Sequence, residues 1–515
     1  MSNQIHIIQN AITTTISEIF RGDFRRICEV KKAVLHLEAI YFCHGTCYLL
    51  KRENMPIKDQ LALYQRIELI PQSTTEFFEN NRECIINNWP EESALAAKPE
   101  ILYDALLASE FCVQPERVGY KIDKVSRDIA GAYYTSSDFS AQITYRALES
   151  YMDRKRRRAI DSDSFACCNE YENITFLDYS CGCGEFLLAV IQYFDNHVLG
   201  YSRKKLATQL RGVDVNPIAL MITIARIVSA VEAEDDENLL REVAKDFIVG
   251  NPLLHSDKIA PLEVRFDNFA LNRLYAETEG INCLELEQQN LVVLGNPPWE
   301  KLRFEERAFF RPVCPAISAI SQKNKREKEI KKLAVNWLEL LEYYQLLQDD
   351  YASVKKEIPK HPLLKVSLVG ELNTYAMFAE LASRLTEKDG FAAIIVKSAL
   401  VTSTCYSSCF RHFVNQGSLS EVFLFDNREK LFQIDSREKF CVLFFGGEHA
   451  GGIKVHYGLT KQEQILSSVP INVTSEELEL INPETGLLPN VADSKEFSFL
   501  LRTHRSLSVF AKEFP

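Results

Sequence analysis

The stretch Ile174-Thr-Phe-Leu-Asp178-Tyr-Ser-Cys-Gly182-Cys-Gly184-Glu-Phe-Leu decides the fold class of this chain. A short apolar run ends in an acid, two closely spaced glycines follow, and apolar residues then recur at helical spacing as far as Phe194. Glycine lets a backbone turn sharply and approach another group closely. The pattern therefore predicts a strand, a tight turn and a helix, which is the repeating unit of an α/β sheet.

The same alternation continues along the chain. Six further short apolar runs are separated by helical patterns, and each run predicts a strand. These runs are Arg211–Val215, Phe247–Val249, Leu291–Leu294, Phe391–Val396, Glu421–Phe425 and Phe440–Phe445. The sequence therefore predicts an α/β fold over the region that begins near residue 171.

The glycine turn favours one kind of ligand over another. Leu187 stands where a dinucleotide-binding turn has its third glycine, so the turn does not match a pyrophosphate site. Asp178, at the predicted end of the strand, suits a ligand that carries a positive amine. An ordinary strand-to-helix turn remains the alternative.

A second acid follows the next predicted strand. In Arg211-Gly-Val-Asp214-Val-Asn-Pro217, Pro217 occupies the first turn of the next helix. An acid at the end of such a strand accepts hydrogen bonds from ribose hydroxyls. A helix-capping role for Asp214 is the alternative.

The most informative stretch is Leu291-Val-Val-Leu-Gly-Asn296-Pro-Pro-Trp299. Prolines carry no N–H, so this turn presents acceptors without competing donors. The side-chain oxygen of Asn296 and the carbonyl of Pro297 suit the two hydrogens of an exocyclic amine, and Trp299 offers a flat face for a ring. A purely structural turn is the alternative.

Composition restricts the function classes. Of the 515 residues, 46% are hydrophobic and 25% are charged, and the net charge of −12 argues against a protein that coats nucleic acid non-specifically. We found no signal peptide pattern and no apolar run of membrane-spanning length, and we expect the 14 scattered cysteines to be reduced. We therefore expect a cytoplasmic protein without membrane partners, and we predict no metal site.

Four segments are predicted along the chain. Residues 1–115 form a helical N-terminal domain, and residues 116–170 form a connector. Residues 171–460 form the α/β domain, interrupted by a helical insertion at 300–370, and residues 461–515 form a C-terminal extension.

Two basic segments leave two interpretations open. Arg154–Arg158 lies in the connector, and Lys323–Lys332 lies in the insertion, where lysines alternate with Glu327 and Glu329. Each segment is either a solvated face or a contact for nucleic acid phosphates.

Taken together, these segments resemble the N6-adenine DNA methyltransferases. The resemblance is closest to the large adenine methylases of restriction-modification and phage-defence systems, and it covers about residues 120–505. It implies a Rossmann-like methyltransferase fold, S-adenosylmethionine as cofactor, DNA as partner, and methylation of adenine N6 on a base that has left the stack.

The resemblance also assigns roles to single residues. Asn296, Pro297, Pro298 and Trp299 match the catalytic tetrapeptide, with Trp for the commoner Tyr. Residues matching cofactor-binding positions are Tyr134, Thr135, Asp178, Cys181, Gly182, Gly184, Phe186, Asp214, Val215 and Asn251. Asn251 stands where the family often has an Asp, and Asn290 where it often has an Asp six residues before the tetrapeptide.

One departure and three alternatives remain open. Relatives of this type continue into a target-recognition domain, so we expect a protein partner, or further sequence, to supply recognition. Similar tetrapeptides occur in methyltransferases of RNA and of protein amides. A non-catalytic DNA-binding subunit of a defence complex is the alternative from another class.

Overall fold

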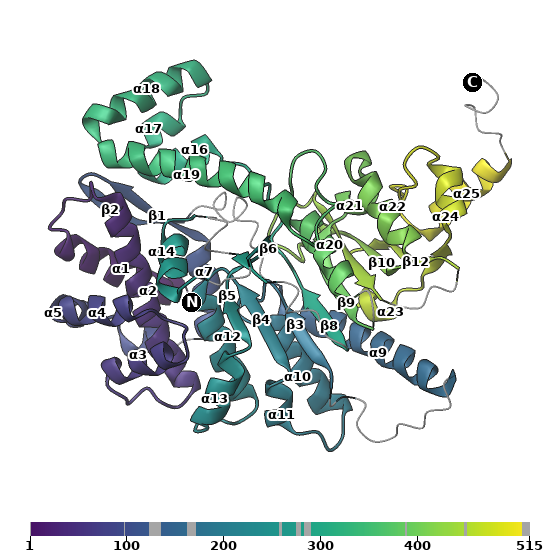
Figure 1. Cartoon of the computed structure of the whole chain (residues 1–515), viewed down its shortest axis with the longest axis horizontal. Coiled ribbons are helices and arrows are strands. Elements are labelled where there is room, and N and C mark those ends of the chain that lie inside the picture. The colour runs from purple at the N-terminus through teal and green to yellow at the C-terminus, as the bar shows by residue number, and fades with distance from the viewer. Residues whose placement is uncertain are drawn as a thin grey trace.

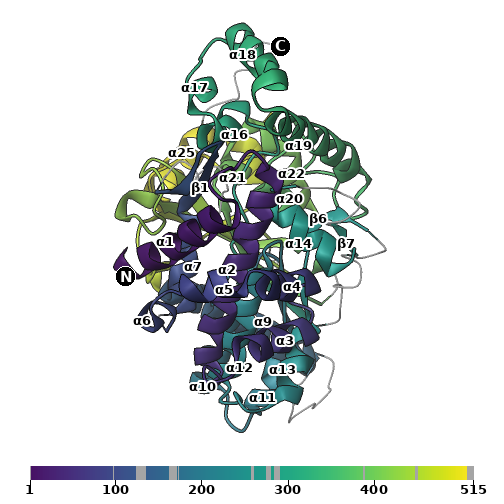
Figure 2. The same ribbon diagram turned by 90° about the vertical axis from the view of Figure 1, so that its left-hand side faces the viewer.

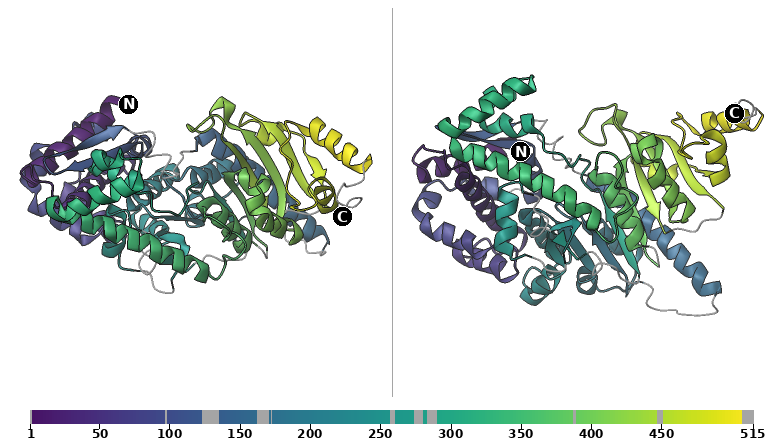
Figure 3. Two further views of the ribbon diagram at one scale, coloured as in Figure 1. Left: turned by 90° about the horizontal axis from the view of Figure 1, so that it is seen from above. Right: turned by 45° about the horizontal axis from the view of Figure 1, so that its top comes forward.

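The structure is a computed structural model that describes residues 2–96, 98–122, 135–161, 171, 173–256, 260–273, 280–282, 290–386, 389–446 and 451–506. A large sheet occupies the centre of the molecule. Helices of the N-terminal region lie at one end, and the last helices of the chain lie at the other (Figures 1 and 3).

The central sheet has nine strands within the described residues. From edge to edge they are β13 (Ile471–Val473), β12 (Ile453–Leu459), β10 (Leu419–Asp426), β11 (Lys439–Phe445), β9 (Phe391–Lys397), β8 (Leu291–Gly295), β3 (Thr175–Asp178), β4 (Leu210–Asp214) and β5 (Phe247–Val249). The five strands from β9 to β5 run parallel, whereas β11 is antiparallel to both of its neighbours. The α/β class predicted from the sequence is thereby confirmed.

Burial explains the apolar runs that predict these strands. All five residues of β8 are buried, as are the first six of β9. Parallel strands that are covered on both faces read as continuous apolar runs. Helices of the α/β region are α9 (Ser137–Asp161), α10 (Glu185–His197), α11 (Arg203–Ala207), α12 (Pro217–Ala230), α13 (Glu237–Ala244), α14 (Leu262–Ala270), α20 (Thr374–Leu385), α21 (Ala399–Thr402) and α22 (Ser407–Asn415).

The N-terminal region is helical and packs against the sheet's helices. Its elements are α1 (Ser2–Ile19), α2 (Ile27–Leu49), α3 (Ile57–Arg66), α4 (Gln72–Asn80), α5 (Arg82–Asn87), α6 (Glu92–Leu95), α7 (Pro99–Leu107) and the hairpin β1 (Ser109–Gln114) with β2 (Arg117–Ile122). Helix α2 is buried along most of its length and packs on α12 together with α7. A helix that is apolar on most sides is stable only when it is enclosed in this way.

Helices also fill the segment that follows β8. They are α16 (Glu306–Val313), α17 (Pro315–Ser318), α18 (Lys323–Asn336), α19 (Leu338–Glu357) and the 3-10 helix η2 (Ile358–Lys360). We call α16 to α19 the arm. Figure 2 shows α17 and α18 standing out from the body of the molecule.

The remaining elements are short or close the chain. They are the parallel pair β6 (Asn251–His255) and β7 (Gly280–Ile281), the 3-10 helices η3 (Thr404–Tyr406) and η4 (Asn427–Glu429), and the helices α23 (Gln464–Ser467), α24 (Ser475–Ile481) and α25 (Ser494–Ser506). The sheet continues past residue 460, where the sequence analysis ended the α/β domain, because β13 forms its edge. Among the helices described, none is long and apolar enough to cross a bilayer.

Candidate active site

The strand order changes direction between β3 and β8. From β3 the chain continues through β4 and β5 on one side, whereas β8 and β9 lie on the other side of β3. Ligands of open α/β sheets bind at such a switch point, outside the carboxyl ends of the strands. Leu177 pairs with Val293, so the turns that follow β3 and β8 leave the sheet side by side at this edge.

Asp178 joins these two turns. A Cβ atom on Gly295 would lie 2.8 Å from Oδ1 of Asp178, so the carboxylate occupies the space that a larger residue would need. Asp178 is only 2% exposed, and its Oδ1 accepts a hydrogen bond of 3.0 Å from the Ser180 amide. Burial raises the pKa of Asp178 to about 8, and the Ser180 amide only partly opposes this shift. A positively charged amine would stabilise the ionised form.

The two glycines have different tasks. Both lie in the left-handed region, with φ of 51° at Gly182 and 85° at Gly184. A Cβ atom on Gly184 would come within 2.7 Å of the Thr223 side chain, whereas one on Gly182 would meet nothing within 4 Å. Thr223 also donates a hydrogen bond of 2.7 Å to the Gly182 carbonyl. Gly184 therefore lets α12 pack closely, and Gly182 leaves room for a ligand to approach the backbone.

Asp214 ties the end of β4 to the glycine turn. Its Oδ2 accepts a bond of 2.9 Å from the Gly182 amide, and its Oδ1 accepts one of 2.8 Å from the Asn216 amide. Burial raises the pKa of Asp214, and these amides act in the opposite direction. A carboxylate has further acceptor sites for hydroxyl groups. The helix cap of α12 is Asn216, whose side chain accepts from Ile218, so Asp214 is not that cap.

Two predicted cofactor contacts, Cys181 and Phe186, are buried together with Cys183, whereas the apolar Val215 is exposed. The side chains of Cys181, Cys183 and Phe186 belong to the core, so they shape the turn from beneath. The Cys181 amide donates to the Val213 carbonyl, which fixes the start of the turn on β4. Val215 is 37% exposed beside Asp214 and offers an apolar surface at the ligand edge.

Asn251 lies at the same edge, directly after β5. Its side-chain oxygen accepts a bond of 3.0 Å from the Leu253 amide. The side-chain oxygen that we predict to contact the cofactor therefore already accepts one hydrogen bond within the local turn. Because a carbonyl oxygen has two lone pairs, it can accept a second one from a ligand.

Asn296 meets Thr135 across a long stretch of chain. The Asn296 amide Nδ2 donates a hydrogen bond of 3.1 Å to Oγ1 of Thr135, which is buried. This contact sets the orientation of the amide, because its nitrogen end faces the hydroxyl. The predicted contact at Tyr134 lies outside the described residues.

Thr374 at the start of α20 holds the turn after β8. Its Oγ1 donates to the Pro298 carbonyl at 2.5 Å and accepts from the Glu300 amide at 3.0 Å. Its own amide donates to the Glu300 carbonyl at 3.0 Å. The backbone on both sides of Trp299 is thus fixed by one buried threonine.

Trp299 differs from the expectation of an available flat face. It is only 4% exposed, with its ring stacked near Phe440 at 6.1 Å between centroids and packed edge-on against Phe432 at 5.2 Å. Its indole nitrogen donates to the Ile395 carbonyl at 3.4 Å. The large apolar area of tryptophan favours this burial.

Several supporting residues were missed in the sequence. Arg226 donates to the Cys183 carbonyl at 2.5 Å and to Glu185 at 2.7 Å, beneath the glycine turn. Tyr103 of α7 shares a short hydrogen bond with Asn216, which brings the N-terminal region into the site. Arg226 could have been found from the sequence, since it is the only charged residue of the apolar helix α12. Nothing in the sequence near Tyr103 indicates its contact with the site.

Two other predictions from the sequence take structural roles. Arg154, the first residue of the connector's basic run, is buried and donates to the carbonyls of Asp389, Gly390 and Gly446. Asn290 has φ of 59° at the start of β8, and its side chain accepts a bond of 3.3 Å from Tyr151. Both therefore support the sheet away from the carboxyl edge.

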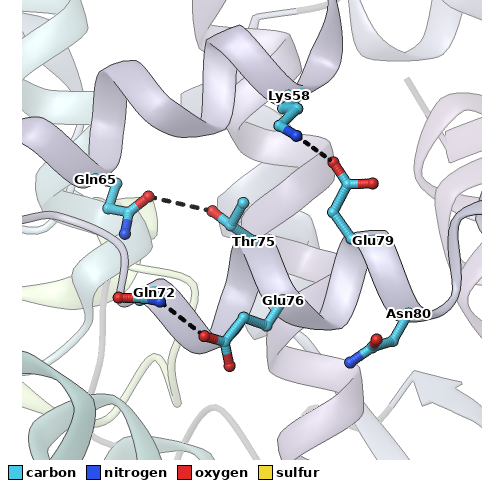
Figure 4. A pocket seen from close by; sticks show the side chains of 7 residues that line it. All are labelled: Lys58, Gln65, Gln72, Thr75, Glu76, Glu79 and Asn80. Atoms are coloured by element: carbon cyan, nitrogen blue, oxygen red, sulfur yellow. Dashed lines mark hydrogen bonds and ion pairs between the residues drawn. The ribbon is translucent and has the colours of Figure 1, made fainter.

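A depression elsewhere shares no residue with this edge. It measures about 600 Å³ and lies between α3 and α4, lined by seven polar side chains (Figure 4). Three of its side-chain pairs are already bonded to each other: Lys58 with Glu79, Gln65 with Thr75, and Gln72 with Glu76. Over the described part of the chain, no group of three His, Cys, Asp or Glu could hold a metal ion.

Neither a family model nor a curated protein sequence matches this chain. Among solved structures, it is similar to the DrdV–DNA complex (12% identity, TM-score 0.47), of which it covers 46% while 92% of this chain is covered. A nuclease-deletion mutant of the Type ISP restriction-modification enzyme LlaGI, in complex with a DNA substrate mimic, has 13% identity and a TM-score of 0.46, with 90% of this chain and 35% of that chain covered.

A third similar structure is a putative class I S-adenosylmethionine-dependent methyltransferase from Listeria monocytogenes. It has 10% identity and a TM-score of 0.36, with 91% of this chain and 97% of that chain covered. The chain spans less than half the length of the first four structures it matches. No family follows from similarities of this size.

Proposed function

We propose that this chain is an S-adenosylmethionine-dependent methyltransferase that acts on the N6 amine of adenine in DNA, within a restriction-modification or phage-defence system. One observation carries the proposal. The carboxylate of Asp178, suited to an amine, lies against Gly295, the residue directly before Asn296. A cofactor held by the first turn would therefore lie next to a substrate held by the second.

The residues at the carboxyl edge fit the parts of this cofactor. In this proposal Asp178 binds the amine of its methionine end, and Asp214 binds the ribose hydroxyls. Val215 offers an apolar surface for the adenine ring, and the open side of Gly182 allows close approach. When bound, the cofactor supplies a methyl group on a sulfonium.

Asn296 and Pro297 would hold the amine that accepts the methyl group. The Asn296 oxygen and the Pro297 carbonyl accept the two N–H bonds, which localises the nitrogen lone pair. Thr135 sets the Asn296 amide so that its nitrogen end is turned to the hydroxyl. Catalysis then depends on positioning and on electrostatics, and no general base is required before attack.

The proposed stacking of the flipped base on Trp299 requires a local change. Phe440 of β11 is stacked near the indole and Phe432 packs edge-on against it, so the ring becomes available only when one of these two side chains moves. Phe432 lies in the segment between η4 and β11, outside the regular strands. Base entry would displace a side chain rather than a strand.

The direct test is Asn296→Ala. We expect methyl transfer to DNA to fall by about 10²–10³-fold, as for the loss of one preorganised hydrogen-bonding group, with cofactor affinity unchanged. Tritiated methyl groups counted on DNA, RNA and protein measure the first effect, and isothermal titration measures the second. Transfer to RNA or protein in place of DNA would show that DNA is not the substrate. Unchanged transfer by the variant would show that Asn296 takes no part in the reaction.

A further inference from the structure

The arm begins directly after the candidate active site. Its first helix, α16, starts at Glu306, six residues beyond Glu300. Polar bonds fix the arm to the N-terminal region: Arg311 pairs with Glu110 of β1 at 3.3 Å, and Trp337 donates to the Arg25 carbonyl at 2.7 Å. The arm is therefore anchored to the N-terminal region by these bonds.

One face of α18 is turned inward. Arg326, Ile330 and Leu333 are buried, and the Arg326 guanidinium donates to Glu306 and to the Ile320 carbonyl. The opposite face carries the lysines of the insertion, and in Figures 1 and 2 this helix stands at the outer limit of the molecule.

The lysines of α18 form two groups. Lys323 pairs with Glu327 at 3.8 Å, and Lys332 pairs with Glu329 at 2.7 Å. Within the residues that the structure describes, no ion pair or hydrogen bond is recorded for the exposed side chains of Lys325, Lys328 and Lys331.

These three lysines follow one side of the helix. Residues at i, i+3 and i+6 fall within an arc of about 120° and rise about 9 Å along the axis. Like charges at this spacing destabilise an isolated helix. We call Lys325, Lys328 and Lys331 the lysine stripe. Two exposed aliphatic residues follow in sequence, Val335 in the last turn of α18 at 90% exposure and Leu338 at the start of α19 at 53%.

A polyanion is the partner that fits this surface. The whole chain carries a net charge of −12, so a set of cations without acidic partners is a local exception. Duplex DNA presents one negative charge per about 1.7 Å of axis, so several phosphates lie within the length of the stripe. The stripe also belongs to a segment that leaves the proposed catalytic turn.

We propose that the lysine stripe binds the phosphate backbone of the DNA substrate. This proposal rests on the proposed function, since it takes DNA as the substrate. Lysine acts here as a point charge for phosphates and reads no sequence. The lysine stripe thus contributes to DNA affinity in a chain whose net negative charge opposes nucleic acid binding.

The test compares two double variants of the full chain. Lys328→Ala with Lys331→Ala removes two members of the stripe, and Lys323→Ala with Lys332→Ala removes two ion-paired lysines of the same helix. Alanine has the highest helix propensity, so α18 should persist in both variants, and circular dichroism checks this. Fluorescence polarisation with a labelled duplex, without cofactor, measures affinity over a range of salt concentrations.

Each lost phosphate contact lowers the slope of log K against log salt by about 0.9. We expect the stripe variant to lose about 1.8 from the slope and the ion-paired variant to lose clearly less. Equal slopes for the wild type and the stripe variant would overturn the proposal. So would a stripe variant that loses binding to vesicles of anionic lipid while it keeps binding to DNA.

The same proteins separate this proposal from the proposed function. With saturating DNA at low salt, the stripe variant should keep the wild-type kcat with a raised KM for DNA. A wild-type chain that binds DNA through the stripe but transfers no methyl group would defeat the proposed function and leave the stripe standing. A stripe variant with unchanged KM and salt slope would defeat only the stripe.

Discussion

The two halves of the candidate site are built in different ways. The turns after β3 and β4 are held mainly by groups close to them in sequence: the Gly182 and Asn216 amides donate to Asp214, the Cys181 amide donates to Val213, and Thr223 and Arg226 of α12 donate to the carbonyls of the glycine turn. The turn after β8 is held by side chains from distant segments, Thr135 and Thr374. The cofactor half is thus a local structure, whereas the catalytic half depends on the whole fold.

This difference leads to separable effects. Substitutions in the first half should change cofactor affinity, and substitutions in the second half should change methyl transfer at saturating cofactor. Gly295, in contact with Asp178, is the one position at which both should change.

The largest effect on cofactor affinity is expected for Asp178→Asn. Loss of a charged hydrogen-bonding partner costs about 1.5–3 kcal/mol, so affinity for S-adenosylmethionine should fall by about 10–100-fold. Because burial raises the pKa of Asp178 to about 8, the carboxyl must lose a proton to meet the amine. Wild-type affinity should therefore rise as the pH increases from 6 to 8, and the variant should lack this rise.

Isothermal titration at several pH values checks this prediction. Asp195→Asn is the matched control, since this acid lies on the surface at the end of α10 and bonds to Tyr201 and Arg203. Equal affinities of the wild type and Asp178→Asn for S-adenosylmethionine would show that Asp178 does not bind the amine of the cofactor.

Gly295→Ala should affect both halves. The new methyl group would lie 2.8 Å from Oδ1 of Asp178, so the carboxylate or the turn must move. We expect cofactor affinity and the rate of transfer each to fall by about tenfold. Cofactor binding and single-turnover transfer measured on one preparation would show both effects. If only the affinity or only the rate fell, Gly295 would not link the two halves of the site.

Thr374→Val should affect the catalytic half alone. It removes the hydroxyl that bonds to Pro298 and Glu300 and keeps the side-chain shape. Each lost bond is worth about 1 kcal/mol, so the loss of both sets an upper limit of about 30-fold, and we expect transfer to slow by about tenfold while cofactor affinity stays constant. Thr374→Ser, which keeps the hydroxyl, should restore the rate; failure of this rescue would show that the methyl group and not the hydroxyl positions the turn.

The sequence predicts local features well. All seven apolar runs lie in strands of the central sheet, within two residues of the predicted ends, because strands that are covered on both faces are continuously apolar. The two strands missed at one end of the sheet are different: β12 includes the buried His456, which bonds to Glu421 at 2.8 Å, and the edge strand β13 has only three residues. A buried histidine in a strand looks polar until its partner is known.

Long-range contacts limited the prediction of the site. The tetrapeptide was evident, but the cover on Trp299 comes from Phe432 and Phe440, more than 130 residues later. The run that begins at Arg154 looked like a solvated or DNA-binding face, yet its first arginine is buried and donates to three backbone carbonyls. Neither the cover on Trp299 nor the carbonyl contacts of Arg154 can be predicted from the spacing of nearby residues.

The group that we propose this chain methylates is the N6 amine of adenine in DNA. The most direct measurement is nucleoside analysis by mass spectrometry of unmethylated DNA after incubation with the protein and S-adenosylmethionine. N6-methyladenine should accumulate with the wild-type chain and be absent with Asn296→Ala. The account would be contradicted if a protein preparation shown to bind both the cofactor and DNA left adenine unmodified, or modified a different base.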